Sequence, residues 1–283
     1  MLSFNAEKFE QGLRDLGIQH GDLIFLHSDL MALGVPHNAQ NRQEILLFYW
    51  DAFQKVLGPT GTLAVPAYFY EYARFGEPFD TEISPVSKSL GAFSAYVCTI
   101  PGRVRSCNPL QSIVSFGHKA EEISGGDSLS GYGVNSPWHR LRQQKGKIVF
   151  LGVNMEVMTY VHYIEQLVGV PHLYFKVFDF SVYRNGKLIP GNPVSAVRYL
   201  DYQIEYCLKP FEELLFKKGH AKSVNIGNGK ILLVGAEEAY QEGIKALEKN
   251  PYFFLKNPPK FLPGKIPYDG ATGTKTIPAK NMH

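Results

Sequence analysis

The sequence predicts an α/β fold in a single domain, with a mixed central sheet flanked by helices and an inserted β-hairpin. Three observations support this prediction. Short apolar runs alternate with segments of helical periodicity along most of the chain. Polar residues directly follow some of these runs, as is typical of the carboxyl ends of strands that form ligand sites. Asn185-Gly186 lies between two extended runs, which indicates a hairpin and therefore antiparallel pairing.

Helix-capping residues, apolar runs and turn-forming residues predict the helices and strands in the first half of the chain. Asparagine side chains cap helix starts, and Gly21 and Gly58 mark turns. In order, we expect a helix through Phe9, Leu13 and Leu16 capped by Asn5, an apolar strand at 23–26, a helix from Asn38 or Asn41 to Gly58, an apolar strand at 62–65, a helix around 90–97, a strand at 112–117 and a short helix through Trp138 and Leu141.

The second half begins with another strand, turn and helix. The strand is the apolar run Ile148 to Leu151, and Gly152 breaks it. Beyond it we expect a helix through Val157, Tyr160, Val161, Ile164 and Val168, the hairpin of 175–183 with 187–189, a long helix from Tyr199 to Phe216 broken or kinked at Pro210, a strand at 231–234 and a helix at 236–247. Residues 1–257 form the expected domain, and 258–283 an extended tail.

Composition excludes several classes of protein. The 283 residues are 45% hydrophobic, enough for a substantial core, and the net charge of +3 comes without a basic run, so no nucleic acid partner is expected. Three scattered cysteines exclude a disulfide scaffold or a thiolate zinc site and fit a reducing cytoplasm. No apolar signal core follows Met1, and no run approaches bilayer length, so we expect a cytoplasmic protein without a membrane partner.

A candidate catalytic pair lies on the helix after the 148–151 strand. His162 and Glu165 are three residues apart and so share one helix face. A carboxylate beside an imidazole raises its basicity and fixes its tautomer, which suits a general base, and Thr159 one turn earlier adds a hydroxyl. The alternative is an ordinary ion pair on an amphipathic helix. A third metal ligand is not evident from spacing, so no metal is expected.

Two loops are further candidates. Residues 68–85 are rich in aromatic, acidic, Gly and Pro residues without a period, which indicates a functional or covering loop, with an insertion without a role as the alternative. The loop with Arg103, Arg105 and Ser106 has the guanidinium groups that hold anions, although exposed arginines are ordinary in loops. No Gly-rich phosphate loop and no Gly-x-Ser-x-Gly turn is present.

Several segments together resemble the antibiotic N-acetyltransferase family, typified by aminoglycoside 3-N-acetyltransferases. The resemblance extends from about Phe9 to about Leu255. The segments that carry it are His27-Ser28-Asp29-Leu30 with Gly34, Gly61-Thr62-Leu63 with Val65-Pro66, Arg105-Ser106-Cys107-Asn108-Pro109 with Ser112 and Gly117, Ser136-Pro137, and Thr159 with His162 and Glu165.

The resemblance implies roles for these residues. It makes His162 the catalytic base, Glu165 its orienting partner and Thr159 a donor to the tetrahedral oxyanion. It also implies acetyl-CoA or another acyl-CoA as donor, without a metal. The residues that it places at the coenzyme A site are His27, Ser28, Leu30, Arg105, Ser106 and Ser112. The acceptor is expected at Asn108 and at Tyr68, Glu71 and Asp80 of the 68–85 loop.

Two positions depart from the family pattern and bear on specificity. Many members carry His where Asn108 stands and Ser where Asp29 stands. Asn108 keeps hydrogen bonding but cannot titrate, and Asp29 brings a negative charge near the expected coenzyme A site.

We therefore expect an acyl-CoA-dependent N-acyltransferase that acts on an amino sugar by direct attack of the amine. The mixed charge of the 68–85 loop argues weakly against a strong aminoglycoside site, so a nucleotide-linked amino sugar of polysaccharide synthesis is the alternative acceptor. A non-catalytic coenzyme A-binding protein and, third, a metal-dependent hydrolase are alternatives of other classes. The expected partner is a small molecule, and a homodimer is left open.

Overall fold

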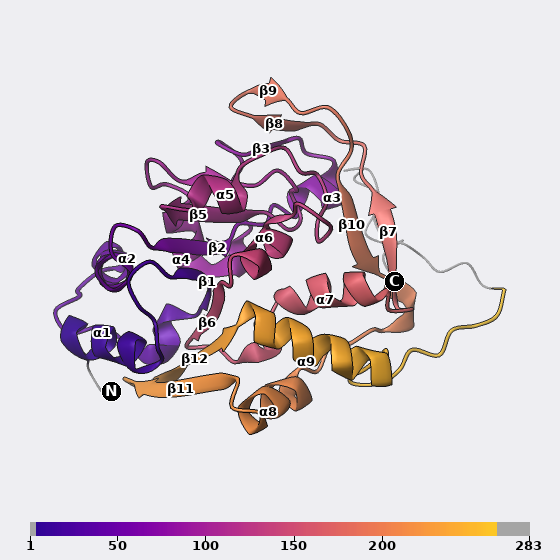
Figure 1. Cartoon of the computed structure of the whole chain (residues 1–283). Coiled ribbons are helices and arrows are strands. Elements are labelled where there is room, and N and C mark those ends of the chain that lie inside the picture. Colours follow the sequence, from indigo (N-terminus) through magenta and orange to yellow (C-terminus); the bar gives the residue numbers. More distant parts are fainter. Residues whose placement is uncertain (1–3, 265–283) are drawn as a thin grey trace.

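The computed structural model describes residues 4–264, apart from the side chain of Asp201 (Figure 1). The helices are α1 (Ala6–Asp15), α2 (Arg42–Leu57), α3 (Glu71–Phe75), α4 (Gly91–Val97), α5 (Ala120–Ser124), α6 (Pro137–Gln143), α7 (Tyr160–Val168), α8 (Lys209–Lys217) and α9 (Ala236–Lys249), with 3-10 turns η1 (Leu30–Leu33), η2 (Lys88–Leu90), η3 (Met155–Val157) and η4 (Leu200–Tyr202). The strands are β1 (Leu23–Ser28), β2 (Thr62–Pro66), β3 (Phe79–Asp80), β4 (Val104–Arg105), β5 (Ile113–Gly117), β6 (Lys147–Leu151), β7 (Leu173–Val177), β8 (Val182–Arg184), β9 (Lys187–Leu188), β10 (Val194–Arg198), β11 (Ala221–Ile226) and β12 (Gly229–Gly235).

A mixed seven-stranded sheet forms the centre, in the order β11-β12-β6-β1-β2-β5-β4. The three inner strands β6, β1 and β2 are parallel, and the outer pairs are antiparallel. Buried parallel strands need apolar side chains on both faces, which explains the continuous apolar runs of the sequence. The predicted mixed α/β class is confirmed.

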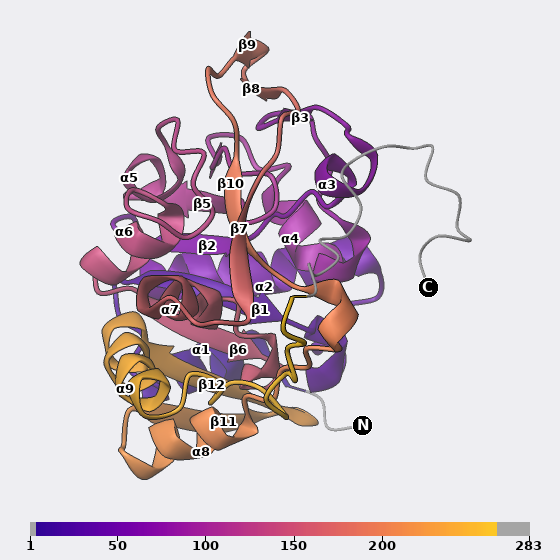
Figure 2. The same cartoon turned by 90° about the vertical axis from the view of Figure 1, so that its right-hand side faces the viewer.

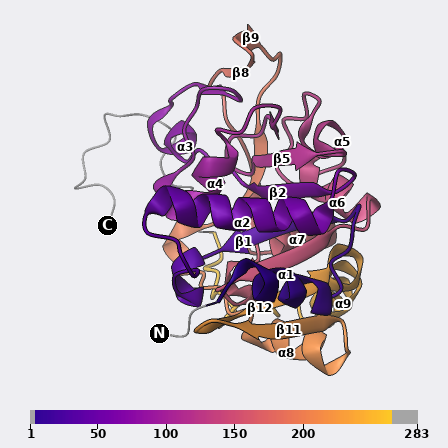
Figure 3. The ribbon, with the colours of Figure 1, turned by 90° about the vertical axis from the view of Figure 1, so that its left-hand side faces the viewer.

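Helices cover both faces of this sheet. Ile24 and Leu26 of β1 face α1, α2 and α4, whereas Phe25 packs with Trp138 of α6 and Ile164 of α7 on the other face. The alternation follows from the two-residue period of a strand. Figure 3 shows α1 and α2 in front of the sheet, and Figure 1 shows α7 and α9 on the opposite side.

Two small sheets lie outside the central sheet, and the hairpin of β8 and β9 projects from the body (Figure 2). β7 pairs with β10, and β8 pairs with β3 and β9. Asn185 and Gly186 have φ of 50° and 70°, so the predicted hairpin turn is confirmed between β8 and β9. The run expected as one strand at 175–183 is instead two strands, because the Phe178 side chain turns inward to pack against Tyr72.

The expected helix from Tyr199 to Phe216 is wrong. The chain forms only the short turn η4, Gln203 adopts a left-handed φ of 48°, and α8 begins at Lys209. Pro210 lies in the first turn of α8, where a missing N–H costs nothing, so it starts the helix and does not kink it.

Two other sequence predictions are refined. The strand β11 is absent from the sequence prediction, because four of its six residues are polar or small and only Ala221 and Ile226 are buried. Residues 258–264 contain no helix or strand, and the rest of the expected tail lies outside the described residues. No helix within residues 4–264 is long and apolar enough to cross a membrane.

Candidate functional site

The site lies where the parallel strands end. Ser28 of β1 pairs with Leu151 of β6, and the Asp29 N–H donates to the Leu151 carbonyl at 2.8 Å. Gly152 then turns the chain with a φ of 70°, and a Cβ there would overlap the Asp29 carbonyl oxygen. Glycine at this position therefore lets the loops after β1 and β6 pack together and lets the chain turn toward α7.

A cavity of about 920 Å³ opens at this edge. It is bounded by the ends of β1 and β2, by Val153 in the loop after β6, by the start of α2, and by η2 with the start of α4. Its lining includes His27, Ser28, Leu30, Asn41, Arg42, Pro66, Tyr68, Tyr70, Lys88, Leu90, Phe93, Val153 and Thr159. Five of the residues expected at the site, His27, Ser28, Leu30, Tyr68 and Thr159, therefore lie around one cavity.

His27 is a neutral group in the wall of this cavity. Its ring is 5.5 Å from the parallel ring of Phe150 and 4.9 Å from the ring of Phe25. Burial lowers the pKa of His27 to about 3, because the charged imidazolium would lose its water. Its Nε2 has no hydrogen-bond partner within residues 4–264.

Thr159 and Tyr68, two residues with hydroxyl groups, line the same cavity. Thr159 is the N-cap of α7, but its side chain makes no capping hydrogen bond. Burial raises the pKa of Tyr68 well above its ordinary value, and the side chain of Thr159 only partly offsets this. Both groups therefore remain protonated at neutral pH and can donate hydrogen bonds.

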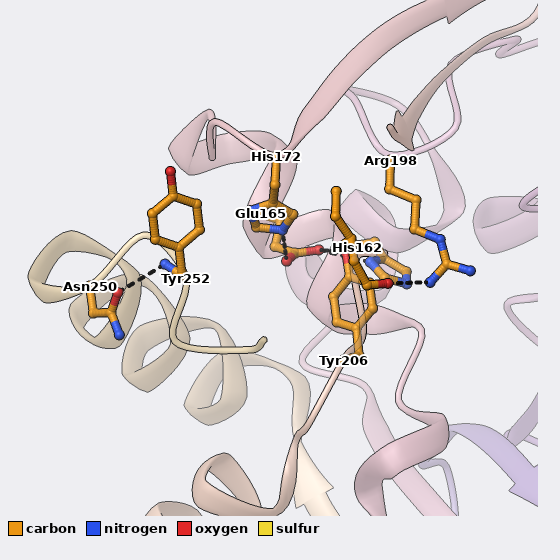
Figure 4. Close-up of polar contacts among 8 residues, drawn as sticks. His162, Glu165, His172, Arg198, Tyr206, Asn250 and Tyr252 are labelled. Carbon is orange, nitrogen blue, oxygen red and sulfur yellow. Dashed lines mark hydrogen bonds and ion pairs between the residues drawn. The ribbon is translucent and has the colours of Figure 1, made fainter. Parts of the chain in front are cut away.

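The predicted pair on α7 is formed. The Nδ1 atom of His162 is 2.8 Å from an oxygen of Glu165, whose side chain is fully buried, whereas the His162 side chain is 31% exposed (Figure 4). The helical spacing of three residues is thus sufficient to join the two groups.

Two more residues bind the same carboxylate, and the sequence did not indicate them. Nε2 of His172 is 2.9 Å from the second oxygen of Glu165, and the Tyr206 hydroxyl donates to the first at 2.9 Å. His172 follows α7 after a turn, and Tyr206 lies 41 residues beyond Glu165, so neither shares a periodic pattern with it. In the sequence, only their polar, hydrogen-bonding side chains indicated that His172 and Tyr206 could be partners of Glu165.

The environment keeps Glu165 ionised. Burial alone would raise its pKa, but the hydrogen bonds from His162 and His172 outweigh burial and hold the pKa below its ordinary value. An ionised carboxylate can only accept hydrogen bonds, so Nδ1 of His162 must carry the proton. Nε2 of His162 is then the nitrogen with a lone pair for a substrate proton.

His162 and Glu165 are not in the cavity lining, and neither are four other expected site residues, Arg105, Ser106, Ser112 and Asn108. The Arg105 guanidinium is buried, donates to the carbonyls of Ala67, Ser84 and Pro85, and stacks over Phe79. The other three are also buried in hydrogen bonds to protein groups. Ser106 accepts from the Ile113 N–H, Ser112 donates to the Ala67 carbonyl, and Asn108 donates to the carbonyls of Leu129 and Val194 and accepts from Leu110 and Gln111. These residues anchor the start of the 68–85 loop and the loops around it.

The acidic residues of the 68–85 loop are also engaged. Glu71 accepts from the Ser87 hydroxyl at 3.0 Å. Asp80 accepts from the backbone N–H groups of Glu82 and Gly186 and so attaches the β8–β9 turn to the body. Neither carboxylate lines the cavity. Within the described part of the chain, no group of three His, Cys, Asp or Glu side chains is placed to hold a metal ion.

Known proteins match this chain over most of its length. The family model described as aminoglycoside 3-N-acetyltransferase matches residues 25–248. Aminoglycoside N(3)-acetyltransferase IV of a Salmonella species is 26% identical over 250 residues, which cover 87% of this chain and 88% of that protein. Aminoglycoside N(3)-acetyltransferase III of Enterobacter cloacae is 25% identical, with 85% and 90% covered.

Solved structures share the fold. The apoenzyme of aminoglycoside acetyltransferase AAC(3)-IVa matches with a TM-score of 0.72 at 24% identity, over 90% of this chain and 93% of that chain. The binary structure of AAC-IIIb with CoASH matches with a TM-score of 0.74 at 23% identity, over 91% and 100%.

Proposed function

We infer that this chain, which belongs to the aminoglycoside 3-N-acetyltransferase family, transfers an acetyl group from acetyl-CoA to an amine of an amino sugar. One observation carries the proposal. A buried, ionised Glu165 holds Nδ1 of His162 at 2.8 Å on a helix whose first residue follows Thr159, and Thr159 lines a cavity of about 920 Å³. The proposed base, His162, thus lies one helical turn from Thr159, which lines the cavity proposed for the acyl donor.

The cavity suits coenzyme A in size and charge. Its volume falls within the range of small-molecule sites. Arg42 and Lys88 bring positive charge to its lining, and α2, a helix of 16 residues, begins there with the positive end of its dipole. These groups would hold the phosphates. The lining also includes Asp29, whose carboxylate accepts a hydrogen bond from the Met31 N–H. The expected contact of Arg105, Ser106 and Ser112 with coenzyme A remains a prediction. In the structure these side chains are hydrogen-bonded to other groups of the protein.

The chemistry begins at His162. An amine is mostly protonated near neutral pH and attacks a thioester only after it has lost a proton. Nε2 of His162 accepts that proton while Nδ1 keeps its hydrogen bond to Glu165. The imidazolium that forms is then paired with a buried carboxylate, and His172 and Tyr206 keep that carboxylate in place.

The hydroxyls of Thr159 and Tyr68 support the acyl transfer itself. As the amine nitrogen bonds to the thioester carbon, the carbonyl oxygen gains negative charge, and hydroxyl donors at the cavity wall stabilise it. Collapse of this intermediate breaks the carbon–sulfur bond and expels the coenzyme A thiolate. The second proton of the attacking nitrogen passes to that thiolate, so the products are the acetamide and the free thiol of coenzyme A. No covalent enzyme intermediate is required.

The relatives indicate one acceptor class. The matched structures of AAC(3)-IVa include complexes of a histidine-to-alanine mutant with a gentamicin and with apramycin. Aminoglycosides are therefore the first acceptors to test on this chain. A nucleotide-linked amino sugar is the second, because Glu71 and Asp80 are already engaged within the protein.

The test is release of free thiol from acetyl-CoA in the presence of amines. We expect His162→Ala to lower turnover about 100- to 10,000-fold, the contribution of a positioned base, while coenzyme A affinity measured by calorimetry stays unchanged. His118→Ala, at an exposed histidine beyond β5, is the matched control. Wild-type turnover in His162→Ala would exclude the base, and coenzyme A binding without thiol release from any amine would favour a non-catalytic binding protein.

A further inference from the structure

We propose that Arg198 binds an anionic group of the acceptor, so that the preferred acceptors are amines that also carry a phosphate or carboxylate. The inference rests on the proposed function, because it names the acceptor class of the same site. It is carried by the position of Arg198, by its lack of a charged partner among the described side chains and by the state of the nearby carboxylates.

Arg198 lies beside the catalytic cluster (Figure 4). It is the last residue of β10, and its Nη1 donates to the Ile204 carbonyl at 3.1 Å. Ile204 is two residues before Tyr206, which donates to Glu165 and whose ring is 4.8 Å from that of His162. Burial raises the pKa of Tyr206, and the positive charge of Arg198 opposes that shift, so the guanidinium acts electrostatically on this cluster.

The charge of Arg198 is not neutralised by any side chain that the structure describes. The side chain is exposed, and no described carboxylate lies within 4 Å of it. By contrast, Arg103, Arg142 and Arg184 are paired with Glu82, Glu237 and Asp127. Arg198 therefore keeps N–H donors available for a ligand.

The neighbouring carboxylates already have partners within the protein, which disfavours binding of a polycationic acceptor. Glu205, next to Tyr206, is paired with Lys256 at 2.9 Å. Glu165 is occupied by three donors. In the 68–85 loop, Glu71 and Asp80 accept hydrogen bonds from protein groups and Glu82 is paired with Arg103, and Glu77 also has a partner. These contacts would compete with the ammonium groups of a polycationic acceptor.

An anionic amine fits this arrangement chemically. The planar guanidinium presents parallel N–H groups that match the oxygens of a phosphate or carboxylate. Figure 4 shows Arg198 beside His162, so an acceptor with its anion on Arg198 would bring its amine near that imidazole. The anion would also be attracted by a chain of net charge +3.

The experiment uses acceptors that differ mainly in charge. Thiol release from acetyl-CoA would be measured with glucosamine, glucosamine 6-phosphate, a UDP-linked amino sugar and gentamicin. We expect wild-type protein to prefer the phosphorylated acceptors. Arg198→Gln should raise their KM about 10- to 100-fold, the loss of one charged hydrogen-bonded contact, with kcat and coenzyme A affinity nearly unchanged. Arg198→Lys should fall between, since it keeps the charge but loses the planar fork.

The controls separate this inference from the proposed function. Arg14→Gln removes another exposed arginine, on α1 and far from the cluster, and should change nothing. In wild type, raising the salt concentration should raise KM for glucosamine 6-phosphate, and Arg198→Gln should reduce this dependence. Thiol release with gentamicin and glucosamine, with every KM unaffected by Arg198→Gln, would overturn the inference and leave the function standing. Absence of release with all four amines would overturn both.

Discussion

Glu165→Gln tests the role of the buried carboxylate beside His162. The carboxylate accepts hydrogen bonds from His162, His172 and Tyr206 at 2.8 to 2.9 Å. Glutamine keeps the shape but removes the charge, and its amide presents an oxygen on one side only. We expect that oxygen to face His162 and Tyr206. The amide nitrogen then faces His172, which can accept by moving its proton to Nδ1, an atom without a partner within residues 4–264.

The expected loss follows from the geometry. Two unit charges 2.8 Å apart attract by about 6 kcal/mol at an effective dielectric constant of about 20. Because the His162 side chain is 31% exposed, water screens much of this attraction. We therefore take about one third of it, about 2 kcal/mol, as the net interaction energy. This energy stabilises the imidazolium that exists only after proton transfer. Since about 1.4 kcal/mol is tenfold in rate, kcat/KM should fall about 30-fold.

The assay is thiol release from acetyl-CoA over a range of pH. We expect a lower kcat/KM for Glu165→Gln at every pH within that range. Glu242→Gln on α9, which removes a carboxylate paired with Lys218 and Lys245, is the matched control. Equal kcat/KM and equal pH profiles for Glu165→Gln and wild type would refute the reasoning.

Three further predictions concern the cavity and its walls. Lys88→Ala should weaken coenzyme A binding about 3- to 10-fold in calorimetry at low salt and less at high salt; the same loss at both would contradict a phosphate contact. His27 has a folded-state pKa of about 3 against 6.5 unfolded, so the native state binds fewer protons and stability falls as pH drops below about 6.5. The free energy of unfolding of wild type, measured in urea, should fall by about 2 kcal/mol between pH 7 and pH 5 because of this group. In His27→Phe this part of the decrease should be absent. Gly152→Ala should lower the thermal midpoint more than Gly219→Ala, because both have positive φ but only at Gly152 would the Cβ meet backbone, that of Asp29; equal shifts would count against the close loop packing.

The sequence was sufficient for the elements of the centre of the fold. The runs at 23–26, 62–65 and 148–151 became β1, β2 and β6, because strands buried on both faces must be apolar throughout. The pair of His162 and Glu165 could also be predicted, since spacing of three residues brings side chains together on any helix. Asn185-Gly186 specified its own turn by backbone preference.

The sequence misled where the neighbours in space decided the outcome. Arg105 and Ser106 were expected in a loop, but Arg105 lies in β4, and its guanidinium is buried against backbone carbonyls of the 67–85 segment. The apolar residues between Tyr199 and Phe216 suggested one helix, but Tyr206 is held in place by Glu165, and the helix begins only at Lys209.

What the sequence by itself determined is therefore local: strands, turns, helix starts and the contact between His162 and Glu165 on α7. Only the tertiary structure decided that His172 and Tyr206 share the carboxylate of Glu165, that Arg198 lies beside them without a charged partner among the described side chains, and that Lys88 lines the cavity with Thr159. The physical reason is that helices and strands have fixed periods, which side-chain spacing records. Contacts between distant segments depend on how those elements pack, and no spacing along the chain records that.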